Sequence, residues 1–178
     1  ASGTLDVPIG LTVDPLSGTM MLVVAGIGAL INLYYVGYMW EEEGFARYFS
    51  YLNLFVFFML TLVLGSSLPL MFLGWEGVGL CSYLLIGFYF DKEYAAVAGK
   101  KAFVTNRIGD FGFVLGFCIL FMLFGSVDFD TMMGMTRDVS AMHAITIVGV
   151  TATPTFWFNL AGCCLFVGAM GKSAQIPL

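Results

Sequence analysis

Four ionisable side chains stand inside long apolar stretches of the sequence, where a charge is costly. They are Glu76, Arg107, Asp110 and Lys172. A lysine, arginine or aspartate at the centre of a membrane costs at least about 2.5–3.5 kcal/mol on insertion scales. Residues that persist despite this cost usually face the interior of a helix bundle and mark the path of an ion. Their types therefore predict the transfer of a proton or a cation.

Glu76 is the clearest of the four. It lies about eight residues into its apolar stretch, or about 12 Å of helical rise, near the middle of a hydrocarbon core about 30 Å thick. Gly74, Gly77 and Gly79 surround it, and such small residues leave room for another backbone or for water. The alternative is a structural carboxylate that is hydrogen-bonded to a neighbouring helix.

Lys172 follows two glycines, Gly168 and Gly171, and precedes Pro177. Glycine and proline around a charge within the membrane are typical of an interrupted helix whose backbone groups line a cavity. The alternative is a lysine at the end of a helix, with its amine reaching the cytoplasmic interface.

Arg107 and Asp110 are three residues apart on one predicted helix, so their side chains can pair. Gly109, Gly112 and Gly116 mark a face of that helix where another helix can approach closely. The spacing is compatible with structural pairing and with a role in transport.

The composition of the chain indicates that these four residues belong to a membrane protein. Of the 178 residues, 60% are hydrophobic and 11% are charged, and the mean hydropathy is +0.93. A soluble domain has about 45–50% apolar and about 25% charged residues. The net charge of −5 also argues against a nucleic-acid partner. We therefore predict an all-α integral membrane protein, a bundle of about five transmembrane helices.

We expect a single transmembrane domain over residues 1–178, which is a piece of a longer protein. The expected spans cover residues 16–40, 48–65, 68–90, 101–124 and 156–176. Residues 125–143 have the composition of a polar loop, and 144–155 have no clear assignment. The four cysteines lie in apolar runs and His143 is the only histidine, so no metal site is predicted.

The distribution of lysine and arginine predicts the orientation of the spans. The 91–107 segment carries four of these residues, whereas the 125–143 segment carries Arg137 alone. Because short cytoplasmic loops are rich in lysine and arginine, residues 91–101 should face the cytoplasm. Residues 41–47, two spans earlier, should then lie on the same side.

The stretch FLGWEGVGLCSYLLIGF, residues 72–88, closely resembles a signature of one protein family. This family is the antiporter-like subunit L (mitochondrial subunit 5) class of respiratory complex I, the NADH:quinone oxidoreductase. Residues 101–110 and 168–178 agree with the same family, in the same order. The resemblance implies an antiporter-like fold built from inverted helix repeats, of which this chain is a part.

The resemblance also implies a function. The protein would translocate protons as electrons pass from NADH to quinone, and Glu76, Lys172, Arg107 and Asp110 would carry that translocation. No cofactor is expected on this chain, because NADH, FMN, iron–sulfur clusters and quinone would bind other subunits. Its partners would be neighbouring antiporter-like membrane subunits and the lipid bilayer.

The resemblance places the protein in the bacterial inner membrane, or in the mitochondrial inner membrane if the gene is organellar. Asn32 stands where many relatives have histidine, which makes a proton relay at that position doubtful. One alternative is a subunit of a multi-subunit Na⁺/H⁺ antiporter or of a membrane-bound hydrogenase, which share the Glu and Lys motifs. The other is a structural membrane subunit without an ion path, against which the buried charges argue.

Overall fold

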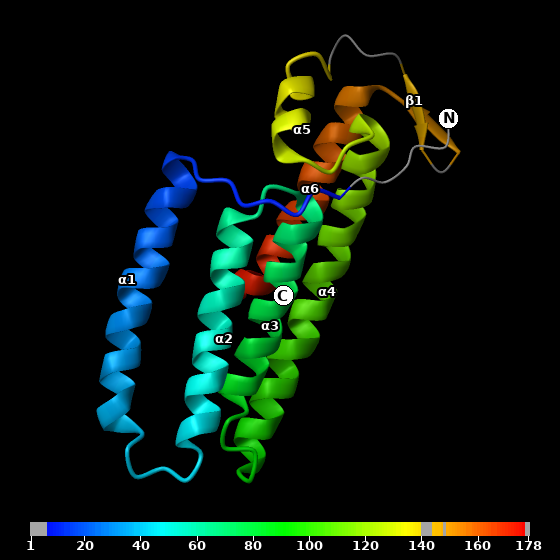
Figure 1. The fold of residues 1–178 in the computed structure, drawn as a ribbon. Helices are drawn as coiled ribbons and strands as arrows, with labels where there is room; N and C mark the ends of the chain where they lie inside the picture. The colour runs from blue at the N-terminus through cyan, green and yellow to red at the C-terminus, as the bar shows by residue number, and fades with distance from the viewer. Residues whose placement is uncertain (1–6, 140–143, 148, 177–178) are drawn as a thin grey trace. The chain divides into compact units, whose positions relative to one another are not determined.

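The computed structural model describes residues 7–139, 144–147 and 149–176. In this part of the chain, six helices and one two-stranded hairpin follow one another (Figure 1). The helices are α1 (Pro15–Tyr38), α2 (Phe45–Leu64), α3 (Leu68–Ile86), α4 (Glu93–Phe124), α5 (Phe129–Thr136) and α6 (Pro154–Ser173). The strands are β1 (Ile145–Ile147) and β2 (Val150–Ala152).

All helices except α5 are long and apolar enough to cross a membrane. The predicted fold class, an all-α bundle of about five transmembrane helices, is therefore confirmed. The described residues pack as two compact units. The first unit comprises residues 10–65 and 70–104, and the second includes 66–69 and 105–176.

In the first unit, α1 begins at a reciprocal cap. The Asp14 side chain accepts a hydrogen bond of 2.6 Å from the backbone N–H of Ser17, and the Ser17 hydroxyl accepts one of 2.8 Å from the Asp14 N–H. Both bonds satisfy N–H groups that the first turn of a helix leaves without partners. Pro15 follows at the first helical position, where its missing N–H costs nothing.

The cap gives the stability of α1 a predictable pH dependence. Hydrogen bonds from Ser17 lower the pKa of Asp14 below its usual value of 3.8, so the ionised form stabilises the fold. This contribution is fully present above pH 3.8 and is lost as the pH falls through the folded-state pKa. We expect Asp14→Ala to lower the melting temperature slightly at neutral pH, with a difference that shrinks in acid. Asp14→Asn, which keeps the acceptor oxygen, should lose less; an equal loss would contradict the capping role.

Helix α4 begins at Glu93, eight residues before the expected start of that span at residue 101. The two lysines favour a helix, as do the alanines that precede them; these residues are Ala95, Ala96, Ala98, Lys100 and Lys101. A charge on a helix marks the edge of the hydrocarbon and does not end the helix. With 32 residues, α4 is about 48 Å long and exceeds the thickness of the core.

In the second unit, residues 125–155 hold more structure than the sequence indicated. Asp128 caps α5 by accepting a 3.0 Å hydrogen bond from the N–H of Thr131. The strands β1 and β2 pair antiparallel, and Gly149 has a positive φ of 80° between them. The indole N–H of Trp157 on α6 donates to the Ile145 carbonyl. The hairpin therefore lies against the beginning of α6, while His143 lies outside the described residues.

Candidate functional site

A seam of small residues joins the second half of α4 to α6. A Cβ atom added to Gly109 would lie 3.0 Å from the Gly171 Cα and 3.2 Å from the Gly168 carbonyl oxygen. A Cβ atom on Gly112 would lie 2.9 Å from the Cys164 carbonyl oxygen. The two backbones are thus in contact. The sequence predicted that this face of α4 meets another helix, and the structure identifies that helix as α6 (Figure 1).

Arg107 and Asp110 pair beside this seam. The Arg107 Nη2 atom lies 2.9 Å from the Asp110 Oδ2 atom, so the pairing predicted from their three-residue spacing is present. The Asp110 residue is 4% exposed, and Asn106 beside it is 9% exposed. The Arg107 side chain is 36% exposed, so the carboxylate is the buried member of the pair. Burial of a charge costs desolvation energy that good geometry only partly offsets, so a buried aspartate inside an apolar helix is more typical of function than of stability.

Lys172 follows directly on the residue of α6 that touches α4. Since Gly109 contacts Gly171, Lys172 lies at the same height as the Arg107–Asp110 pair. Gly109 is fifteen residues, or about 22 Å, before the end of α4 at Phe124. If the end of α4 marks one edge of a hydrocarbon core about 30 Å thick, Gly109 lies about 8 Å from the other edge. Three charged side chains therefore share one level inside the membrane.

Helix α6 ends immediately after this level. Ala174 adopts the left-handed conformation, with φ 49° and ψ 41°, and its N–H donates to the Met170 carbonyl. The Gln175 N–H donates to the same carbonyl at 3.2 Å. Lys172 is in the last turn, where the negative end of the helix dipole favours a cation.

Glu76 lies in the first unit, on α3. It is eight residues after the start of that helix and ten before its end, so it is near the middle of a span. Gly74 and Gly77 bring α3 against α2, because a Cβ atom on Gly74 would lie 2.7 Å from the Leu62 Cα and one on Gly77 would overlap the Phe58 ring. The close approach that these glycines predicted is thus made with α2, and Glu76 itself is half-buried.

The structure therefore brings three of the four predicted residues together, and Glu76 belongs to the other packing unit. The joint role of the four residues in proton translocation stays a prediction. Asn32 donates a 2.9 Å hydrogen bond to the Gly28 carbonyl of its own helix, an arrangement that keeps its amide occupied within α1. Among the described residues, no group of three or more His, Cys, Asp or Glu could hold a metal ion.

A comparison with known families settles the class of protein that carries these charges. Residues 65–178 match the family described as "NADH:quinone oxidoreductase/Mrp antiporter, TM". The chain belongs to this antiporter family. Residues 1–49 match a second description, "NADH-Ubiquinone oxidoreductase (complex I), chain 5 N-terminus". The predicted relationship to the subunit L class and the integral membrane character are both confirmed.

Individual members of the antiporter family match over almost the whole chain. The NADH-quinone oxidoreductase subunit L of Rhodobacter capsulatus is 46% identical over 184 residues, which cover 99% of this chain and 25% of the relative. The corresponding subunit of Neisseria meningitidis is 43% identical over 99% of this chain and 26% of the relative. The chloroplastic NAD(P)H-quinone oxidoreductase subunit 5 of Zygnema circumcarinatum is 43% identical, over 96% of this chain and 23% of the relative. The chain thus spans about a quarter of the length of these relatives.

Proposed function

We propose that the full-length protein is a proton-translocating subunit of an NADH:quinone oxidoreductase, and that the charged level between α4 and α6 is part of its proton path. The observation that carries this proposal is the Arg107–Asp110 ion pair, whose carboxylate is buried inside a membrane span, at the height of Lys172. The similarity to oxidoreductase subunits L and 5 supports the assignment of the protein to this complex.

Lys172 is the proton carrier in this proposal, because an amine can take up and release a proton without a metal or a cofactor. While Arg107 and Asp110 are paired, their charges largely cancel. If the pair opens and the Asp110 carboxylate turns to the amine, a unit charge at about 4 Å stabilises the bound proton by about 4 kcal/mol at an effective dielectric of 20. Opening and closing of the pair would therefore load and release the proton of Lys172.

Glu76 acts in the same path as a second carboxylate on a separate span. The energy for these changes would come from electron transfer elsewhere in the complex. NADH, FMN, iron–sulfur clusters and quinone would bind other subunits, and neighbouring antiporter-like membrane subunits would be the direct partners.

A second candidate function has support in the family description, which names Mrp antiporters beside the oxidoreductase. In that case, the same residues would exchange protons for sodium ions without NADH. Inside-out vesicles that contain the full-length protein in its native complex distinguish the two functions. Proton uptake that is driven by NADH and unaffected by sodium supports the oxidoreductase, whereas proton movement driven only by a sodium gradient supports the antiporter.

Lys172→Ala in the full-length protein tests the residue assignment. We expect the assembled complex to translocate fewer protons per electron than the wild type, because the carrier is gone while the redox subunits are intact. The measurement is proton uptake against NADH oxidation in the same vesicles. Lys92→Ala is the matched control, since Lys92 is exposed outside the spans, over the Tyr89 ring. A wild-type ratio for Lys172→Ala would refute the assignment.

A further inference from the structure

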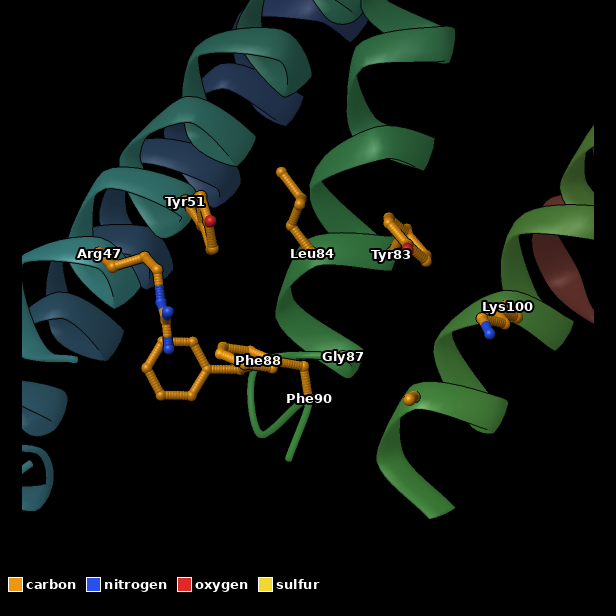
Figure 2. A pocket seen from close by; sticks show the side chains of 9 residues that line it. Arg47, Tyr51, Tyr83, Leu84, Gly87, Phe88, Phe90 and Lys100 are labelled. Carbon is orange, nitrogen blue, oxygen red and sulfur yellow. The ribbon is translucent and has the colours of Figure 1, made fainter. Parts of the chain in front are cut away.

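A pocket of about 220 Å³ lies among α2, α3 and α4 in the first packing unit (Figure 2). Its lining includes two cations from different helices, Arg47 of α2 and Lys100 of α4, together with aromatic side chains. We infer that this pocket binds the phosphate-bearing headgroup of an anionic phospholipid. This inference assigns a lipid site and does not depend on the proton path.

The pocket lies at the end of the helices that the sequence assigns to the cytoplasmic side. Arg47 is in the first turn of α2, and Lys100 is seven residues after the start of α4. The turns on this side pack together, because the Tyr89 hydroxyl donates to the Glu42 carboxylate at 3.2 Å. The Phe88 ring also lies 5.2 Å from that of Tyr48. Since α4 is longer than the hydrocarbon core is thick, its first turns can lie at the level of the headgroups.

Two aromatic rings lie close to the guanidinium of Arg47. Its guanidinium carbon lies 4.9 Å from the centre of the Phe88 ring and 5.1 Å from that of Phe90. A guanidinium is planar and presents its N–H donors in a fork that matches phosphate oxygens. The contact also replaces part of the hydration that the cation loses when it leaves water.

Lys100 supplies the second charge from the opposite wall of the pocket (Figure 2). Among the described residues that line the pocket, none is an Asp or a Glu, so the lining itself favours an anion. Basic pockets between membrane helices on the cytoplasmic side are suited to anionic lipid headgroups, and each Lys or Arg near the surface contributes attraction. Tyr51 and Tyr83 add hydroxyl-bearing rings to the same lining.

The size and surroundings of the pocket favour a lipid over a soluble anion. A volume of about 220 Å³ is below the roughly 300–1,000 Å³ of sites that enclose a whole small molecule, so it suits a headgroup whose remainder lies outside. Leu84 and Phe88 provide an apolar wall for the glycerol region. Phe90 and Tyr94 are 58% and 72% exposed, and an exposed tyrosine is typical of a membrane interface.

Photo-crosslinking in nanodiscs tests the site. The native complex with the full-length protein is placed in phosphatidylcholine nanodiscs that contain a small fraction of phosphatidylglycerol with a photoreactive headgroup. Crosslinked peptides are then mapped by mass spectrometry. We expect labelling of the peptides that contain Arg47 and Lys100. We expect each cation that lines the pocket to contribute about 1 kcal/mol, the value for a Lys or Arg near an anionic surface. Arg47→Gln or Lys100→Gln should therefore reduce the labelling about fivefold, and the double variant roughly 25-fold.

Lys101→Gln is the matched control, since Lys101 is adjacent in sequence and is not part of the pocket lining. It should keep wild-type labelling. A photoreactive phosphatidylcholine probe in the wild-type complex provides a test that needs no variant, and it should label the site weakly. Equal labelling by both lipids, or unchanged labelling in the double variant, would overturn the inference. Displacement of the lipid probe by inorganic phosphate would also overturn it, because the pocket would then be a site for the free ion.

Discussion

Glu76→Gln in the full-length protein is expected to suppress NADH-driven proton translocation about tenfold or more while the complex still assembles. Glutamine keeps the size and the hydrogen-bonding capacity of glutamate but cannot carry its charge or its proton. A unit charge about 4 Å from a group that carries a proton changes the free energy of proton binding by about 4 kcal/mol at an effective dielectric of 20. Loss of only about 1.4 kcal/mol of this interaction would already change the rate about tenfold. Proton uptake by inside-out vesicles, normalised to the amount of assembled complex, measures the effect.

Two control variants separate this effect from a general loss of charge. Glu43→Gln removes an exposed carboxylate near the beginning of α2, and Arg137→Ala removes a charge at the end of α5. Both should translocate protons at the wild-type rate. If Glu76→Gln did the same in an assembled complex, Glu76 would be a structural carboxylate, and the path would have to run through the α4–α6 level alone.

Gly171→Leu is expected to disrupt the contact between α4 and α6 and to reduce the amount of assembled complex strongly. Overpacking a well-packed site usually costs about 1–3 kcal/mol, and here the cost should reach or exceed the upper end. The opposing atoms are the Gly109 backbone and the Thr105 carbonyl oxygen, at 3.0 and 3.3 Å from the added Cβ atom. A backbone cannot rotate away as a side chain can.

A graded series on the same helix makes this prediction specific. Gly171→Ala adds only the Cβ atom and should have a smaller effect than leucine. Gly162→Leu is the matched control, because Gly162 also lies on α6 and a Cβ atom there would meet nothing within 4 Å. It should assemble normally and can even favour the helix, since leucine is a better helix former than glycine. Native gels report assembly, and limited proteolysis of the purified complex reports local order. Equal losses at residues 162 and 171 would contradict a specific seam.

Long apolar stretches made the membrane-spanning helices predictable from sequence, because a bilayer demands about 20 apolar residues for each span. The residue at which α4 starts was harder to predict. Lysines at 100 and 101 indicate the edge of the hydrocarbon, but hydropathy does not report that a helix continues through it. Short elements were also difficult to predict from sequence. A three-residue strand such as β1 has too few residues to show a periodic pattern, and the pairing that stabilises it is not local.

The candidate site was also predictable only in those features that depend on residues close together in the sequence. Spacing on one helix was sufficient to predict the Arg107–Asp110 pair, and the glycines of α4 were sufficient to predict a close neighbour. Neither could name α6 as that neighbour, because the choice depends on packing between distant segments. The pocket of Arg47 and Lys100 was not predicted at all. Its two cations are 53 positions apart in the sequence, and each alone has the appearance of an ordinary interfacial anchor.

The contact between Gly109 and Gly171 also restricts how the sequence can drift. In most cores, a residue that grows can be accommodated when its neighbour becomes smaller, so that paired changes keep the total volume constant. Glycine is already the smallest residue, and with glycine on both helices neither position can compensate for growth at the other. Mutations at this crossing can therefore not be rescued by a second change across the interface, and purifying selection acts on each codon separately.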